Sequence, residues 1–168
     1  MANRNIRHMT RAALFAALLA ACAWISLPVG DIGFTLQTFG VFLTLGVLGG
    51  KWGTVSILIY LLLGGIGLPV FSGFRGGLGM LLGVTGGYLW GFVAAGLVYW
   101  ALERVAKPLA MALGMAACYI CGSLWFTLYS GGGIGLVFLR CVVPYLIPDA
   151  AKIWLAYSLS RRLHRHIT

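Results

Sequence analysis

Long apolar runs, broken by very few charges, constrain the fold of this sequence more than any other feature. Hydrophobic residues make up 61% of its 168 residues and charged residues only 9%, with a mean hydropathy of +0.97. Soluble domains carry charge on about a quarter of their residues. The sequence is therefore that of a membrane protein. Since a crossing takes about 20 apolar residues, the chain has room for at most about six spans and for no soluble domain.

The apolar runs predict an all-α membrane protein, with one transmembrane domain over residues 1–168 and six spanning helices. The expected spans are about 11–27, 36–50, 54–67, 83–102, 109–129 and 148–163. The last third is ambiguous, because a continuous helix over residues 136–159 would be interrupted twice, at Pro144 and Pro148. We therefore expect a short outer segment near residues 137–143, a turn at Pro144 and Tyr145, and a final span that begins at Pro148.

The cations of the sequence indicate its orientation in the membrane. Nine of the twelve form four clusters at the ends of predicted spans: Arg4, Arg7 and Arg11; Lys51; Arg104 and Lys107; and Arg161, Arg162 and Arg165. The positive-inside rule then places both termini in the cytoplasm, and the loops near residues 28–34, 68–79 and 130–147 outside. The formal charge of +9 thus reflects topology. Its basic tail is expected to meet lipid headgroups, and nucleic acid is not an expected partner.

The first span carries two interleaved alanine stripes, one on Ala12, Ala16 and Ala20 and the other on Ala13, Ala17 and Ala21. Small residues at this spacing let helices approach closely in lipid. The stripes are expected either to pack inside the chain or to face a partner subunit. The segment also resembles a secretory signal, but its apolar run continues and five further spans follow, which favours an uncleaved helix.

The segment Pro148-Asp149-Ala150-Ala151-Lys152 places an acid and a base three residues apart in an apolar run. The whole sequence has only three acidic residues. A charge in hydrocarbon is unfavourable by roughly 2.5 kcal/mol or more, so Asp149 and Lys152 are candidates for a functional site and for each other's partner. On a helix that begins near Pro148, both would lie near its N-terminus on one face. The alternative is an ion pair that only fastens helices.

Further polar residues are candidates for the same site. Gln37 and its neighbours appear where the second span begins, so they must face protein or a cavity. Tyr88, in a glycine-rich stretch, suits either a pocket wall or the membrane interface. Arg75 lies in a second glycine-rich stretch. It is expected either to contact an anionic ligand or to be an exposed cation. That stretch lacks the Gly-Lys-Ser/Thr of a nucleotide-binding loop.

Nothing in the sequence predicts a metal, a cofactor or catalysis. Cys118 and Cys121 form a single CxxC, while all three histidines lie at the termini, so the cysteines are expected to be packing residues. No nucleophile or metal set accompanies Asp149 and Lys152, so an enzyme that uses them as acid and base is not expected.

Four motifs in the same order resemble the BioY family, the biotin-specific substrate-binding subunits of energy-coupling factor (ECF) transporters. The motifs are Phe34-Thr35-Leu36-Gln37-Thr38, Gly67-Leu68-Pro69-Val70-Phe71, Thr85-Gly86-Gly87-Tyr88-Leu89, and Pro144-Tyr145 with Asp149-Ala150-Ala151-Lys152. Three positions depart from the family pattern: Gly33 and Val84 replace usual prolines, and Pro148 stands where the family often has glycine.

The resemblance implies a six-helix subunit of the prokaryotic cytoplasmic membrane that captures biotin at its outer face. Its implied partners are biotin, a transmembrane coupling subunit and two ABC-type ATPases. The implied ligand contacts are Asp149, Lys152, Gln37, Tyr88 and Phe34, with Arg75 as a further candidate, and the implied docking face is Ala12, Ala13, Ala16, Ala17 and Ala20. We expect Asp149 to accept from the ureido ring of biotin, while Lys152 pairs with Asp149 or a ligand anion. A solitary carrier without ATPases, and a structural or receptor membrane protein, remain open.

Overall fold

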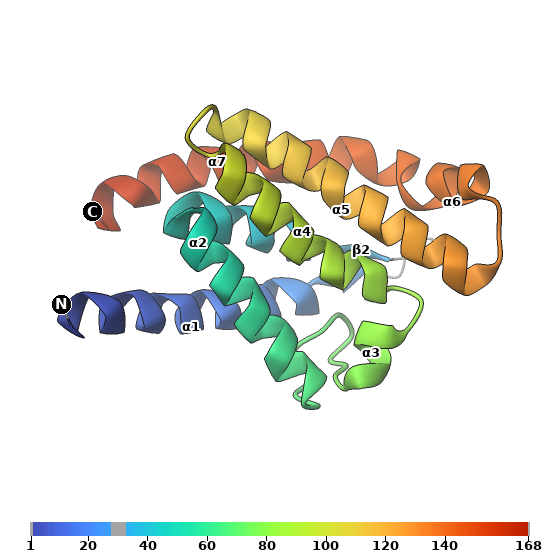
Figure 1. The fold of residues 1–168 in the computed structure, drawn as a ribbon, viewed down its shortest axis with the longest axis horizontal. Helices are drawn as coiled ribbons and strands as arrows, with labels where there is room; N and C mark the ends of the chain where they lie inside the picture. Colours follow the sequence, from blue (N-terminus) through green and yellow to red (C-terminus); the bar gives the residue numbers. More distant parts are fainter. Residues whose placement is uncertain (1, 28–32, 168) are drawn as a thin grey trace.

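The computed structural model describes residues 2–27 and 33–167, and within them the chain is almost entirely helical (Figure 1). The helices are α1 Ala2–Trp24, α2 Gln37–Gly65, α3 Leu78–Leu82, α4 Gly86–Leu102, α5 Lys107–Ser130, α6 Ile134–Cys141 and α7 Leu146–Ile167, with a 3-10 turn at Val143–Tyr145. Two short strands, β1 Ser26–Leu27 and β2 Phe34–Thr35, pair antiparallel. Residues 28–32 of the predicted first outer loop lie outside the described residues.

Helix α2 is broken near its middle, and its two parts run in different directions (Figure 1). Gly49 has φ 78° and ψ 169°, a conformation that glycine adopts without a steric penalty. The backbone N–H of Gly50 donates to Glu103 Oε2 at 2.8 Å, which satisfies one of the donors that begin the second part. The break falls beside the gap predicted between spans 36–50 and 54–67, and Lys51 follows it in the first turn.

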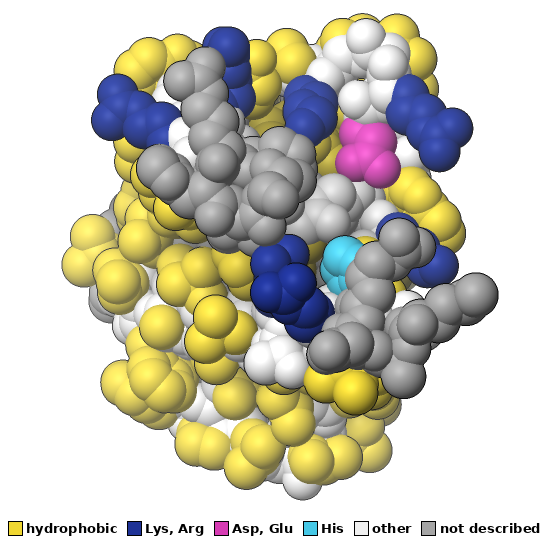
Figure 2. Space-filling view, turned by 90° about the vertical axis from the view of Figure 1, so that its left-hand side faces the viewer, with side chains coloured by type: hydrophobic (Ala, Val, Ile, Leu, Met, Phe, Trp, Pro, Cys, Tyr) yellow, Lys and Arg dark blue, Asp and Glu magenta, His cyan; other side chains and the backbone are white. Residues whose placement is uncertain are grey.

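Both chain termini and the connection between α4 and α5 lie at one end of the molecule, whereas α3 and α6 lie at the other (Figure 1). Lys and Arg side chains gather on the first end (Figure 2). By length and composition, four helical stretches could cross a membrane: Asn5–Trp24, Gln37–Gly65, Lys107–Ser130 and Ile134–Leu163. Helix α4 is a shorter apolar helix. The chain is thus a mostly helical membrane protein with its positive charge concentrated at one end.

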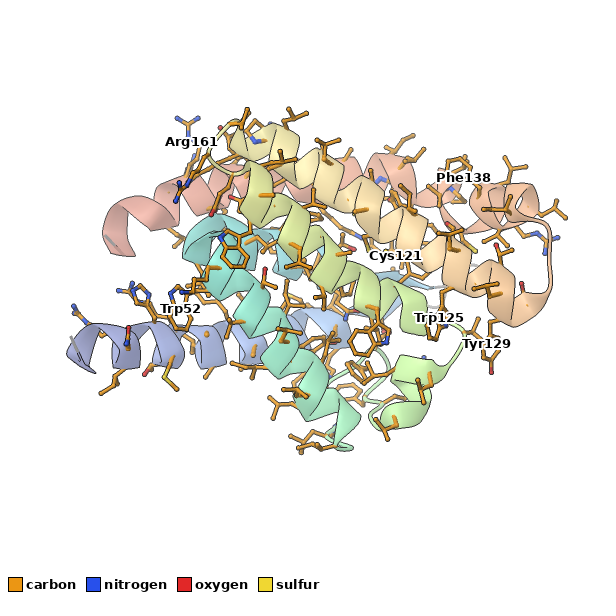
Figure 3. The ribbon with its side chains drawn as sticks, in the orientation of Figure 1. Trp52, Cys121, Trp125, Tyr129, Phe138 and Arg161 are labelled. Carbon is orange, nitrogen blue, oxygen red and sulfur yellow. The ribbon has the colours of Figure 1, made fainter. Side chains whose placement is uncertain are left out.

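Helices α4 and α7 begin at residues other than those predicted, and in both cases a glycine or a proline lies near the boundary. The fourth helix begins at Gly86 instead of residue 83, because Gly83 ends the unpredicted short helix α3 in an extended conformation. Trp125 of α5 donates its Nε1 to the Gly83 carbonyl at 3.0 Å and ties this connection to α5 (Figure 3). The last helix begins at Leu146, so Pro148 lies in its first turn, where no intrahelical N–H bond is lost.

The two alanine stripes of α1 face opposite ways. Ala12, Ala16 and Ala20 are at most 5% exposed and pack in the hydrophobic core, whereas Ala13 and Ala17 are exposed. The structure therefore corrects the assignment of Ala12, Ala16 and Ala20 to a partner face, because neighbouring helices of the same chain already cover them. Only the second stripe remains available to a partner.

Candidate ligand-binding site

A pocket opens among β2, the start of α2, the loop after α2, and helices α4, α5 and α7. It contains about 770 Å³ of space free of protein atoms, part of it open to solvent. Five predicted ligand contacts from separate parts of the sequence line it: Gln37, Arg75, Tyr88, Asp149 and Lys152. Its other walls are mainly aromatic and aliphatic, among them Phe71, Leu89, Phe92 and Met115. This combination of apolar walls and a few convergent polar groups is typical of small-molecule sites.

Asp149 and Lys152 form a buried ion pair in the first turns of α7. Lys152 Nζ lies 2.8 Å from Asp149 Oδ1, and the two residues are only 7% and 5% exposed. The ammonium also donates to the backbone carbonyl of Thr35 at 2.7 Å and lies 3.8 Å from the centroid of the Phe34 ring. These contacts offset the loss of hydration that makes a buried charge unfavourable. Phe34 therefore contributes to the site through the contact of its ring with the Lys152 ammonium.

The second carboxylate oxygen has a partner that the sequence did not reveal. Tyr119 of α5 donates its hydroxyl to Asp149 Oδ2 at 2.7 Å, so each oxygen of this carboxylate already accepts one hydrogen bond. An ionised carboxylate has about four lone-pair sites, which leaves further acceptor capacity on both oxygens. Because Asp149 also lines the pocket, a ligand donor can reach that capacity without displacing Lys152 or Tyr119.

Gln37 is fixed by a hydrogen bond inside the core. Its Nε2 donates to the hydroxyl of Tyr60 at 2.7 Å, and the Tyr60 ring packs edge-on against Phe71 with centroids 5.4 Å apart. Gln37 is 5% exposed and still lines the pocket. Its amide oxygen is an acceptor, so Gln37 can present an oriented polar group to a ligand.

Tyr88 brings an unsatisfied hydroxyl to the pocket. Its Oη is buried and has no hydrogen-bond partner within the described residues. Its ring lies directly on Gly122 of α5, where an added Cβ would collide with the ring atoms. A buried polar group without a partner costs about 1–3 kcal/mol, so a ligand that bonds to this hydroxyl would recover that free energy.

Arg75 enters the pocket from the loop that follows α2. The Phe71 N–H donates to the Arg75 carbonyl at 2.9 Å and closes a small hairpin, while Arg75 Nε donates to the Ser72 carbonyl at 3.2 Å. The side chain lines the pocket and stays exposed. Arg75 is therefore placed at the mouth, where it can meet an anionic group.

Tyr119, which lines the pocket, and Tyr60, which holds Gln37, are two polar residues that sequence reasoning missed. Tyr119 lies between Cys118 and Cys121, whose CxxC was interpreted as packing; Cys118 is buried, and Cys121 lies half-buried on α5 (Figure 3). The described residues contain no group of three metal-ligating side chains. Both tyrosines lie well inside predicted spans, whereas tyrosines of the membrane interface lie near helix ends. Their position inside the predicted spans was the feature of the sequence that could have indicated a role in the site.

Comparison with known proteins agrees with this arrangement. The BioY family profile matches residues 1–168. The chain is 38% identical over 165 residues to the biotin transporter BioY of Thermotoga maritima, covering 95% of this chain and 97% of that protein. It is 37% identical over 157 residues to a probable biotin transporter BioY of Pyrococcus horikoshii, covering 94% and 96%.

A solved structure shares the fold. The crystal structure of the S-component for biotin from an ECF-type ABC transporter matches with a TM-score of 0.88 and 26% identity, covering 98% of this chain and 94% of that one. These relatives are transporters, not enzymes. On this evidence the chain belongs to the BioY family.

Proposed function

We propose that this protein captures biotin at the outer face of the cytoplasmic membrane and serves its uptake as the substrate-specific subunit of an ECF-type ABC transporter. The observation that carries the proposal is the buried Asp149–Lys152 pair, set in an apolar pocket beside the Tyr88 hydroxyl, for which the described residues offer no hydrogen-bond partner. Biotin is proposed as the ligand because the relatives are named as biotin transporters. The pocket supplies groups that suit its chemistry.

Biotin offers two ureido N–H donors, one ureido carbonyl acceptor, an apolar ring and a carboxylate tail. In our proposal Asp149 accepts from a ureido N–H, while Gln37 and Tyr88 complete the hydrogen bonds of that ring. Lys152 pairs with Asp149 at 2.8 Å and holds its side chain in place. Arg75, at the mouth of the pocket, meets the carboxylate.

The apolar ring of biotin would lie against the aromatic and aliphatic walls of the pocket. Phe71 and Leu89 are buried wall residues that are already fixed by their packing in the core. A preformed apolar wall limits the ordering cost of binding. No resident cofactor is proposed, since biotin is the transported ligand.

We further propose six crossings, with α2 crossing twice through its break at Gly49 and both termini in the cytoplasm. The supporting observation is that both termini lie at the end that carries gathered Lys and Arg side chains (Figures 1 and 2). Arg75, Arg140 and the buried Lys152 are the cations outside this pattern. The pocket then opens toward the outside, where a ligand arrives.

The proposed partners are a transmembrane coupling subunit and two ABC-type ATPases. The chain itself has no nucleotide-binding motif, so ATP-driven uptake needs other subunits. The exposed stripe of Ala13 and Ala17 on α1 is the proposed docking face, since small residues permit the close approach that helix association in lipid requires.

Thermal unfolding in detergent, with and without biotin, tests the ligand. A ligand that binds the folded state alone raises the unfolding temperature, by an amount that grows with its concentration over Kd. We expect a clear upward shift with biotin and none with an analogue altered in the ureido ring. No shift at saturating biotin, in folded protein free of carried-over ligand, would leave a structural or receptor role.

Uptake tests the partners. Vesicles that contain the protein alone are compared with vesicles that also contain a coupling subunit and ATPases. ATP-dependent accumulation of biotin only in the second set is expected, and equal accumulation in both would indicate a solitary carrier.

A further inference from the structure

The loop between α2 and α3 is fastened to the end of α1 by one side chain, Trp24. Trp24 Nε1 donates to the Pro69 carbonyl at 2.8 Å. The indole also stacks on the Phe74 ring, with centroids 5.1 Å apart and planes inclined by 22°. A single residue thus holds this loop at two points, one just before the hairpin formed by Phe71 and Arg75 and one within it.

The hairpin presents different side chains to its two sides. Phe71 is 1% exposed, packs against Tyr60 and lies over Gly64, where an added Cβ would collide with its ring. Phe71, Ser72 and Arg75 line the pocket. Phe74, between them, is 64% exposed and turns outward to Trp24.

The backbone at Phe74 is strained in a way that the stack explains. Its φ is 56°, and it is the single non-glycine residue with positive φ among the described residues. A bulky side chain rarely adopts this conformation, which persists only where surrounding contacts enforce it. Gly73, directly before Phe74, and Gly77, after the hairpin, also have positive φ. The stack with Trp24 holds the Phe74 ring outward, while Arg75, the next residue, lines the pocket.

We propose that Trp24 is a positioning residue that keeps this hairpin closed over the pocket and thereby sets the dissociation rate of the bound ligand. The proposal rests on the biotin capture proposed above. Trp24 does not line the pocket, so it acts through Pro69 and Phe74 on Ser72 and Arg75. The competing role is an aromatic anchor at the membrane interface, which would leave ligand release unchanged.

The test measures the dissociation rate of radiolabelled biotin from the full-length protein in lipid nanodiscs. Trp24→Phe keeps a ring for Phe74 but loses the hydrogen bond, and Trp24→Leu loses both. An aromatic stack and a hydrogen bond each correspond to a few-fold change, so we expect the rate to rise about threefold for Phe and about tenfold for Leu. Trp154→Phe is the matched control, because Trp154 is 69% exposed on α7 and does not line the pocket.

Two further variants separate positioning from general damage. Phe74→Gly removes the ring and relaxes the backbone, so it should accelerate release as Trp24→Leu does. In an Arg75→Gln background the effect of Trp24→Leu should shrink, because the residue that it positions is gone. Unfolding temperatures without biotin identify any variant that is merely destabilised, and Trp24→Phe then serves as the milder substitution.

Unchanged release from Trp24→Leu and Phe74→Gly in a parent protein that binds biotin would overturn the positioning role. An undiminished effect of Trp24→Leu in the Arg75→Gln background would overturn it as well. A parent protein that does not bind biotin at all would instead overturn the proposed function, so the two failures are distinguishable.

Discussion

Replacing Asp149 by Asn removes the negative half of the buried pair and leaves the Lys152 ammonium, 7% exposed, without its counter-ion. Removing one partner of a buried ion pair costs about 3–5 kcal/mol, because the remaining charge stays out of water. We therefore expect Asp149→Asn to lose about 3–5 kcal/mol of unfolding free energy. Lys152→Met should lose a comparable amount, since among the described residues it leaves Tyr119 as the one side chain that donates to the carboxylate.

The double variant separates the structural role of the pair from ligand binding. With both charges gone no buried ion remains at this site, so the double variant should be more stable than either single variant. Biotin affinity should not recover, because the ureido donors have lost their charged acceptor. Unpaired buried donors cost about 1–3 kcal/mol, or roughly a 5- to 150-fold weaker Kd.

Denaturant titration in mixed micelles measures the unfolding free energy, and isothermal titration calorimetry measures the biotin Kd, for the parent and all three variants. Tyr119→Phe is the matched control: it keeps both charges and removes only the 2.7 Å bond to Oδ2, so its loss should be about 1.5–3 kcal/mol. A double variant that binds biotin as tightly as the parent would refute the role of Asp149. A double variant as unstable as the two single losses combined would refute the pairing argument.

Three other predictions follow from the structure. Tyr88→Phe should weaken biotin binding about fivefold or more in calorimetry without lowering the unfolding stability, because its hydroxyl has no partner in the described structure; unchanged affinity would count against the contact. Gly122→Ala should lower the unfolding temperature and abolish biotin binding by displacing the Tyr88 ring, whereas Gly135→Ala, with open space around it, should do neither. Ala17→Trp should leave biotin binding in detergent intact and block ATP-driven uptake in vesicles, whereas Ala16→Trp should unfold the protein; normal uptake by Ala17→Trp would remove that face from the docking surface.

The sequence predicted much of the site because its signals are local. Asp149 and Lys152 lie three residues apart, so helical spacing alone places them on one face. Gln37 and Tyr88 stand in motifs that resemble a known family, and the structure brings both to the pocket. Whether each of them touches the ligand stays a prediction.

Other features depend on tertiary contacts that spacing does not encode. Both alanine stripes of α1 have the same period, and which stripe is buried depends on where α2 packs. Tyr119 gains its role only because α7 places Asp149 within reach of α5. Trp24 and Phe74 are 50 residues apart in the sequence, and neither belongs to a recognisable motif.

The hydrogen bond from Lys152 to the Thr35 carbonyl joins residues 117 positions apart in the sequence. This separation affects when the site can form during synthesis. During synthesis the early part of the chain enters the bilayer first, and long-range contacts wait for the segment that completes them. Until α7 arrives, Thr35 and Tyr119 lack the partners that they have in the finished fold. The part of the pocket that Asp149 and Lys152 form is therefore completed only when α7 is inserted.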